Sequence, residues 1–199
     1  QYPGRQERRL EPLIDNVAEM ADRVTEVLGP FLDRPTAFFG HSMGAIIAFE
    51  VARRLARRSG FSPAVFYASG RRAPSTVREE NVHRRTDDGI IDELKEMSGT
   101  DSRVLGDEEL LRLVLPAIRN DYKAIETYVC DPDAALNCPI TALVGDSDPK
   151  TTTDEARMWQ RHTTGPFDMV TFSGGHFYLA NHQAAILRRI TADLDAASG

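Results

Sequence analysis

One pentapeptide constrains the fold of this chain more than any other feature. Residues 40–44 read Gly-His-Ser-Met-Gly, a G-x-S-x-G pattern. A short β-prone run, Thr-Ala-Phe-Phe at 36–39, comes before it, and a helix is predicted over 45–58. In this strand-turn-helix context the pattern is typical of an elbow that holds a serine on a sharp turn, clear of its neighbours. So short a pattern also occurs by chance, and its meaning therefore depends on partners elsewhere in the chain.

The elbow itself predicts part of a catalytic site. Gly40 and Gly44 lack the Cβ atoms that would clash where strand and helix pack at the turn. Ser42 can then reach a substrate carbonyl, and the following helix directs its free N–H groups and the positive end of its dipole to the same place. We therefore predict Ser42 as a nucleophile and the backbone N–H of Met43 as a donor to an oxyanion.

Strand-like and helix-like segments alternate along the chain. Runs typical of buried strands occur at 64–69, 139–144 and 169–172, and helical spacing of apolar residues occurs at 10–28, 153–162 and 183–196. In the first of these helices Pro12 falls in the first turn, where proline is tolerated. Strands separated by helices wind a parallel sheet. We predict one α/β domain over 1–199, with a mostly parallel sheet flanked by helices.

The start of the sequence is unusual for such a sheet. Residues 1–5 resemble the end of a strand that enters a turn, and a helix follows with no strand before it. An α/β-hydrolase sheet needs earlier strands than these. We expect the sequence to begin inside a domain, with the N-terminal strands missing.

A long region without strand patterns separates 64–69 from 139–144. From 86 to 128 the apolar residues recur at helical spacing, with Gly99, Gly106 and Pro116 as interruptions. An insertion on the side where the βα loops gather can cover a site at the carboxyl ends of the strands. We interpret 86–128 as a helical lid. The alternative is a helix pair that packs on the core without gating anything.

A serine hydroxyl needs a base within hydrogen-bonding reach, and the base needs an acid to fix its tautomer. In an α/β-hydrolase the chain order is serine, acid, histidine. Asp148 follows the strand at 139–144, and His176 follows the strand at 169–172. Asp146 is the rival acid. We favour Asp148 because the loop after Gly145 has to carry the carboxylate away from the strand, and Pro149 can fix the turn behind it; Asp146 would then stabilise the turn.

The remaining histidines and the cysteines are predicted to have no catalytic role. We expect packing or solvent exposure for the other four histidines, which are His41, His83, His162 and His182. Cys130 and Cys138 lack metal-ligand spacing and are predicted to be reduced. No metal site and no cofactor are expected.

Composition excludes some partners. The net charge is −6, which argues against a general nucleic-acid binder. No apolar run approaches the length of a membrane span, and the first residues lack the apolar region of a signal peptide. We expect a cytoplasmic monomer that does not bind membranes.

Taken together, the motifs resemble those of the type II thioesterases that serve polyketide and nonribosomal peptide synthases, a branch of the α/β-hydrolases. The matching segments are Tyr-Pro-Gly-Arg at 2–5, the serine pentapeptide, Ser-Gly-Arg-Arg-Ala-Pro at 69–74, Pro-Ala-Ile-Arg-Asn-Asp-Tyr at 116–122, Gly-Asp-Ser-Asp-Pro at 145–149 and Gly-Gly-His-Phe at 174–177. Many hydrolases share the pentapeptide, whereas the segments at 116–122 and 174–177 narrow the resemblance to this branch.

The resemblance implies hydrolysis of acyl thioesters on the phosphopantetheine arm of an acyl or peptidyl carrier protein, with the arm brought by the substrate. Such enzymes clear stalled or wrongly loaded chains. Ser42 would form an acyl-enzyme, His176 would protonate the leaving thiol and then activate water, and Asp148 would orient His176. The lid would shape an acyl chamber with residues such as Leu94, Met97, Leu110 and Val114. The family places its second oxyanion donor in a loop before the 2–5 turn, and this sequence lacks that loop.

Two questions stay open at this stage. Five arginines near the lid could form a basic patch for an acidic carrier protein, or they could be a solvated face; they are Arg71, Arg72, Arg78, Arg84 and Arg85. The alternative functions are a lipase-like esterase acting on oxygen esters and a non-catalytic module that grips a carrier protein.

Overall fold

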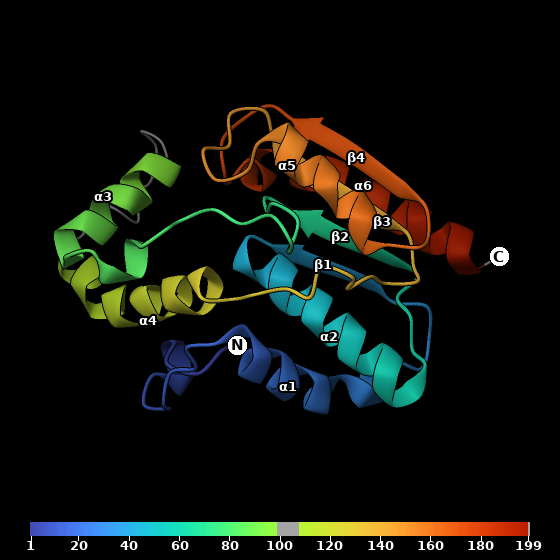
Figure 1. Ribbon diagram of the computed structural model, residues 1–199, viewed down its shortest axis with the longest axis horizontal. Coiled ribbons are helices and arrows are strands. Elements are labelled where there is room, and N and C mark those ends of the chain that lie inside the picture. The colour runs from blue at the N-terminus through green and yellow to red at the C-terminus, as the bar shows by residue number, and fades with distance from the viewer. Residues whose placement is uncertain (99–107, 199) are drawn as a thin grey trace.

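The computed structural model describes residues 1–98 and 108–198, which form a parallel sheet with helices on both faces (Figure 1). The sheet has the order β1-β2-β3-β4. Its strands are β1 (Ala37–His41), β2 (Val65–Ser69), β3 (Ile140–Gly145) and β4 (Phe167–Phe172). All neighbouring strands pair in parallel, with His41 opposite Ser69 at the end of β1. The carboxyl ends of the strands therefore meet at one edge, and the predicted α/β class is confirmed.

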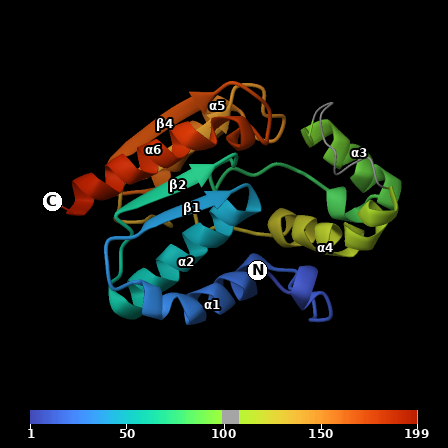
Figure 2. The same ribbon diagram turned by 180° about the vertical axis from the view of Figure 1, so that it is seen from behind.

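Helices cover the two faces of the sheet (Figures 1 and 2). On one face lie α1 (Val17–Leu28) and α2 (Met43–Ser59), and on the other lies α6 (Leu179–Ser198). The short α5 (Thr153–Arg157) continues into a 3₁₀ helix, Met158–His162, and further 3₁₀ turns occupy Gln6–Arg8, Gly29–Phe31 and Val82–Arg84.

The pleat of the strands divides the apolar residues between two clusters. Phe66 and Ala68 of β2 pack with α1 and α2, whereas Val65 and Tyr67 pack against α6. Alternate side chains of a strand point to opposite faces, so a buried parallel strand is apolar at successive positions. This explains why 64–69 reads as a continuous apolar run.

The first and last helices begin elsewhere than we predicted. We expected a helix over 10–28 with Pro12 in its first turn, but α1 begins only at Val17. Asn16 is the N-cap, and its side chain accepts a hydrogen bond from the N–H of Glu19 at 2.8 Å, which satisfies a donor that the first turn leaves free. Leu10 is 89% exposed and has no core to join. At the other end, α6 begins at Leu179 instead of near residue 183.

Two helices lie between β2 and β3, on one side of the sheet domain (Figure 1). They are α3 (Asp87–Ser98) and α4 (Glu108–Glu126), and they share an apolar cluster of their own, formed by Val82, Ile90, Ile91, Leu111 and Leu115. Residues 99–107 of the insertion, with Gly99 and Gly106, lie outside the described residues. The insertion is helical where it is described, and its gating role stays a prediction.

Contacts with the N-terminal segment fix α4 in place. Asp121 pairs with Arg5, Lys123 contacts Asp15 at 2.5 Å, and the side-chain amide of Asn120 donates to a carbonyl in the same segment. The side of the insertion formed by α4 is therefore attached to the sheet domain independently of α3.

Candidate active site

The turn at Ser42 is strained in the way that an elbow requires. Ser42 caps α2 with φ +54° and ψ −125°, a backbone region that side-chain-bearing residues rarely adopt. Its N–H donates to the carbonyl of Ser69 at 2.8 Å, which anchors the turn to β2. A Cβ at Gly40 would lie 2.5 Å from Cα of Ala45. Apart from its chain neighbours and the backbone of its own helix, a Cβ at Gly44 would meet no described atom within 4 Å. The predicted clash is therefore present at Gly40 and is wrong for Gly44.

Asp148 and His176 meet beside this turn. Nδ1–H of His176 donates to the carboxylate of Asp148, with Nδ1 lying 3.0 Å from Oδ2 and 3.1 Å from Oδ1. His176 is 2% exposed and Asp148 is 7% exposed. The backbone N–H of Lys150 donates to Oδ1 of Asp148 at 2.8 Å. A carboxylate on Nδ1 leaves Nε2 of the imidazole free to accept a proton.

Asp146 has a different position. It is exposed, and its carboxylate accepts hydrogen bonds from the N–H of Gly174 at 3.0 Å and from Ser147 Oγ at 2.8 Å. The bond from Gly174 lowers the pKa of Asp146, because it stabilises the carboxylate. Asp146 thus links the loop after β3 to the loop before His176. The carboxylate that binds His176 is that of Asp148.

His41 lies against His176, with the ring centroids 4.9 Å apart. Its Nδ1 lies 2.9 Å from Ser69 Oγ, which lies 2.6 Å from the hydroxyl of Tyr178. Burial, followed by the charge of His176, lowers the pKa of His41 to about 4. We expected packing or solvent exposure for His41, with no catalytic role. The sequence did not predict the chain of hydrogen bonds from His41 through Ser69 to Tyr178. His41 and Ser69 end β1 and β2, and Tyr178 lies two positions after the predicted catalytic histidine.

A cavity of about 520 Å³ joins these residues to the inserted helices. Ser42, Met43 and His176 line it, and so do Leu94 and Met97 of α3, as expected. Val114 is 38% exposed and is not among the described residues that line the cavity, and the side chain of Leu110 lies outside the described residues. Part of the lining was not predicted from the sequence; it is formed by Tyr2, Arg5, His41, Gly44, Glu80, Ile118, Asp121, Tyr122, Ile125, Lys150 and Phe177.

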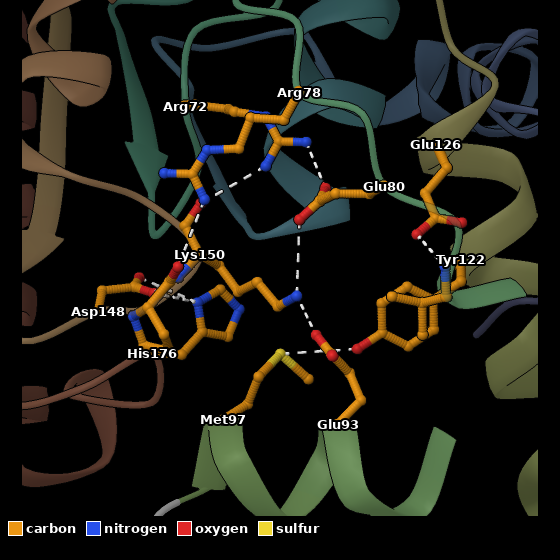
Figure 3. A network of polar contacts seen from close by, with 12 residues as sticks. Arg72, Arg78, Glu80, Glu93, Met97, Tyr122, Glu126, Asp148, Lys150 and His176 are labelled. Carbon is orange, nitrogen blue, oxygen red and sulfur yellow. Dashed lines mark hydrogen bonds and ion pairs between the residues drawn. The ribbon is translucent and has the colours of Figure 1, made fainter. Parts of the chain in front are cut away.

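Ion pairs connect the loop after β3, which carries Asp148, to α3 (Figure 3). The ammonium of Lys150 contacts Glu93, which is 4% exposed, and lies 3.5 Å from Glu80. Arg85 binds the other oxygen of Glu93 at 2.8 Å. The side chain of Lys150 thus reaches α3 from the turn that carries Asp148.

The arginines near the insertion form no open basic patch. Arg72 is buried and pairs with Glu80 at 2.5 Å, and Arg78 pairs with Glu155 at 2.5 Å. Arg85 is paired with Glu93, as described above, whereas Arg84 is exposed. The patch that we considered for docking is therefore largely neutralised by carboxylates from other segments.

Other polar residues have structural partners. His83 pairs with Glu126, His162 is buried and bonds to Ser75, and His182 bonds to the carbonyl of Ser173 at 2.9 Å. Both cysteines are free thiols. In residues 1–98 and 108–198, no group of three or more His, Cys, Asp or Glu side chains could hold a metal ion. None of the helices in these ranges has the length and apolar character needed to cross a membrane.

Comparison with known proteins identifies relatives along the whole chain. The sequence model of the thioesterase domain matches residues 1–194. A probable cadicidin biosynthesis thioesterase from Streptomyces griseus is 55% identical over 98% of this chain, and thioesterase PikA5 from Streptomyces venezuelae is 50% identical over 98%. The chain spans 54% of the length of the first relative and 69% of the second.

Solved structures resemble this fold closely. The type II thioesterase BorB from the borrelidin biosynthetic cluster is 49% identical, with a TM-score of 0.91 over 98% of this chain and 79% of that one. YbtT, a type II thioesterase from the yersiniabactin pathway, is 30% identical, with a TM-score of 0.85 over 100% of this chain and 82% of that one.

Proposed function

This chain belongs to the thioesterase domain family, and from that premise we propose that it hydrolyses acyl thioesters with Ser42 as nucleophile, His176 as base and Asp148 as the orienting acid. One observation carries the proposal: His176 is held by Asp148 inside the cavity that Ser42 also lines. A serine on a strained turn, a buried imidazole and a carboxylate on its Nδ1 are the parts that acyl transfer needs.

The reaction has two halves. Nε2 of His176 takes the proton of Ser42 Oγ as the oxygen attacks the thioester carbonyl, and the backbone N–H of Met43, at the start of α2, stabilises the oxyanion. The C–S bond then breaks, and His176 returns the proton to the leaving thiolate. In the second half, water gives a proton to His176 and attacks the acyl-serine. The tetrahedral intermediate then breaks its bond to Ser42 Oγ, His176 returns the proton to that oxygen, and the carboxylic acid is released.

We assign the substrate to acyl groups on the phosphopantetheine arm of a carrier protein. Relatives named for cadicidin biosynthesis and for the borrelidin biosynthetic cluster support this assignment. A cavity whose walls are largely apolar also supports it; its apolar lining includes Met43, Leu94, Met97, Ile118 and Phe177. The role is removal of stalled or aberrant chains from a polyketide or nonribosomal peptide synthase. The enzyme brings no cofactor of its own, and α3 and α4 act as the lid over the acyl group.

A substrate panel tests the proposal. Acyl groups of varied length are presented on a carrier protein, on pantetheine and as oxygen esters, and initial rates are measured for the full-length protein and for Ser42→Ala. We expect the carrier-bound thioesters to react fastest and the variant to be inactive. Faster hydrolysis of oxygen esters would instead indicate a general esterase, and no turnover of any substrate would indicate a binding module.

A further inference from the structure

Arg71 is a cation in the wall of the cavity that also holds Ser42 and Met43. The residue follows β2 and is largely buried. Within the described residues its guanidinium has no hydrogen-bond or ion-pair partner, and its Nε is fully shielded from solvent. A buried charge is costly unless an opposite charge or hydrogen-bond acceptors surround it, so an unpartnered guanidinium here calls for an explanation.

The carboxylates around Arg71 are already engaged by other cations. Glu80 binds Arg72 through Oε2 and faces Lys150 through Oε1. Both oxygens of Glu155 bind Arg78, at 2.5 and 2.6 Å. Among the described residues, Arg71 is therefore a cation of this cluster without a carboxylate in direct contact, although Glu80 and Glu155 are near enough to favour its charged form.

Arg71 keeps its positive charge near neutral pH although it lacks a partner. Burial, followed by repulsion from Arg72, lowers its pKa to about 9, which still leaves the group protonated near neutral pH. A bound anion would remove both penalties. The guanidinium is planar and presents paired N–H donors, a geometry that matches a carboxylate or a phosphate.

The first turn of α2 adds to the positive potential. Met43 and Gly44 begin this helix and line the same cavity as Arg71. Free N–H groups and the positive end of the helix dipole are both found at such an N-terminus. Two independent sources of positive potential, the buried guanidinium and the helix end, thus face one space.

We propose that Arg71 binds an oxyanion of the substrate, either a carboxylate carried by the acyl group or the phosphate of the pantetheine arm. The proposal rests on the thioesterase function proposed above and adds a charge preference to it. Arg71 is then a specificity residue: it discriminates between anionic and neutral substrates, and the cleavage of the C–S bond itself belongs to Ser42 and His176.

Three thioesters of matched length test this preference. They are a neutral acyl group on pantetheine, an acyl group ending in a carboxylate on pantetheine, and the neutral acyl group on phosphopantetheine. For each, kcat/KM is measured with the wild-type protein, Arg71→Gln and Arg71→Lys. Arg84→Gln is the control, because Arg84 is an exposed arginine near the insertion and lies outside the lining of this cavity.

We expect Arg71→Gln to lower the ratio of kcat/KM between one anionic substrate and the neutral one by about tenfold or more, since charge-assisted hydrogen bonds are lost. Lysine should restore part of the ratio, because it keeps the charge without the paired donors. If the ratio falls only for the substrate whose acyl group ends in a carboxylate, Arg71 binds the acyl group. If it falls only for the phosphopantetheine substrate, Arg71 binds the phosphate of the arm. An unchanged ratio for both overturns the proposal.

A binding measurement separates this proposal from the proposed function. The thermal midpoint is followed as malonate or inorganic phosphate is added to the wild-type protein and to Arg71→Gln. A rise that depends on Arg71 supports the anion site even if no thioester is hydrolysed. Equal shifts in the two proteins would contradict it, whatever the thioesterase assay shows.

Discussion

Lys150 donates its backbone N–H to Oδ1 of Asp148, while its side chain crosses to Glu93 of α3. The turn that carries the proposed catalytic acid is therefore attached to an inserted helix through a single residue. The other polar side-chain contacts that α3 makes outside itself go to α4 or to Arg85, which precedes α3, among the residues that the structure describes. A displacement of α3 would therefore act on the loop that carries Asp148.

This link predicts non-additive effects of substitutions at Lys150 and Glu93. Lys150→Met should destabilise the protein by about 3 kcal/mol, because it leaves the buried carboxylate of Glu93 with Arg85 alone. Lys150→Met combined with Glu93→Gln should cost less than the sum of the two single changes, since no buried carboxylate is left unpaired and Arg85, which loses its partner, is exposed to solvent. Urea denaturation measures all three free energies of unfolding.

The control for this cycle is Asp87→Asn, which breaks an exposed pair between α3 and Arg119. Exposed pairs contribute about 0–1 kcal/mol, so this variant should unfold almost as the wild type does. Strict additivity of the changes at Lys150 and Glu93 would show that the pair does not couple the two segments.

The choice between the two carboxylates gives a second prediction. Asp148→Asn should lower kcat by roughly 10⁴-fold, because the amide no longer holds His176 in the tautomer that accepts the serine proton. Asp146→Asn should cost less than about tenfold, since it weakens only the hydrogen bonds to Gly174 and Ser147. Steady-state kinetics of both variants decide the matter, and a larger loss at Asp146 would reverse the assignment.

A third prediction uses the two glycines of the elbow as a matched pair. Gly40→Ala places a methyl group 2.5 Å from Cα of Ala45, and we expect a loss of at least about 3 kcal/mol of stability. Apart from its chain neighbours and the backbone of its own helix, the methyl group of Gly44→Ala meets no described atom within 4 Å, so this variant should fold normally. Because Gly44 lines the cavity, the methyl group should slow turnover of bulky acyl groups. Thermal unfolding of the two variants, and their turnover rates with acyl groups of increasing size, check this contrast. Equal Tm values for the two variants would contradict it.

The sequence was most informative where function depends on a local motif at a strand end. Ser42, Asp148 and His176 each follow a run that reads as a buried strand, and a parallel sheet brings the carboxyl ends of such strands together. The positions of these residues could therefore be predicted without knowing any distance. Their catalytic roles stay predictions.

Features that depend on strand register or on helix rotation could not be predicted. The contact between His41 and Ser69 exists because these residues are opposite each other in β1 and β2. Val114 lies at the edge of the stripe that buries Leu111 and Leu115, so a small rotation of α4 decides whether it faces the cavity. Composition alone also could not show that Arg78 is neutralised by Glu155, which is distant in the sequence.

The last prediction concerns His41 and pH. Its pKa falls from 6.5 to about 4 in the folded protein, because burial and the neighbouring His176 disfavour its charged form, although Asp148 acts in the opposite direction. The unfolded chain therefore binds more protons at this residue between pH 6.5 and 4, and stability is lost as the pH falls through that window. The loss from His41 alone should approach about 3 kcal/mol at pH 4.

In His41→Gln the free energy of unfolding, measured by urea denaturation at several pH values, should fall less steeply over this window. Carboxylates and the other histidines titrate in both proteins, so the difference between the two curves of unfolding free energy against pH isolates the contribution of His41. Parallel curves would show that the proton affinity of His41 does not change on folding.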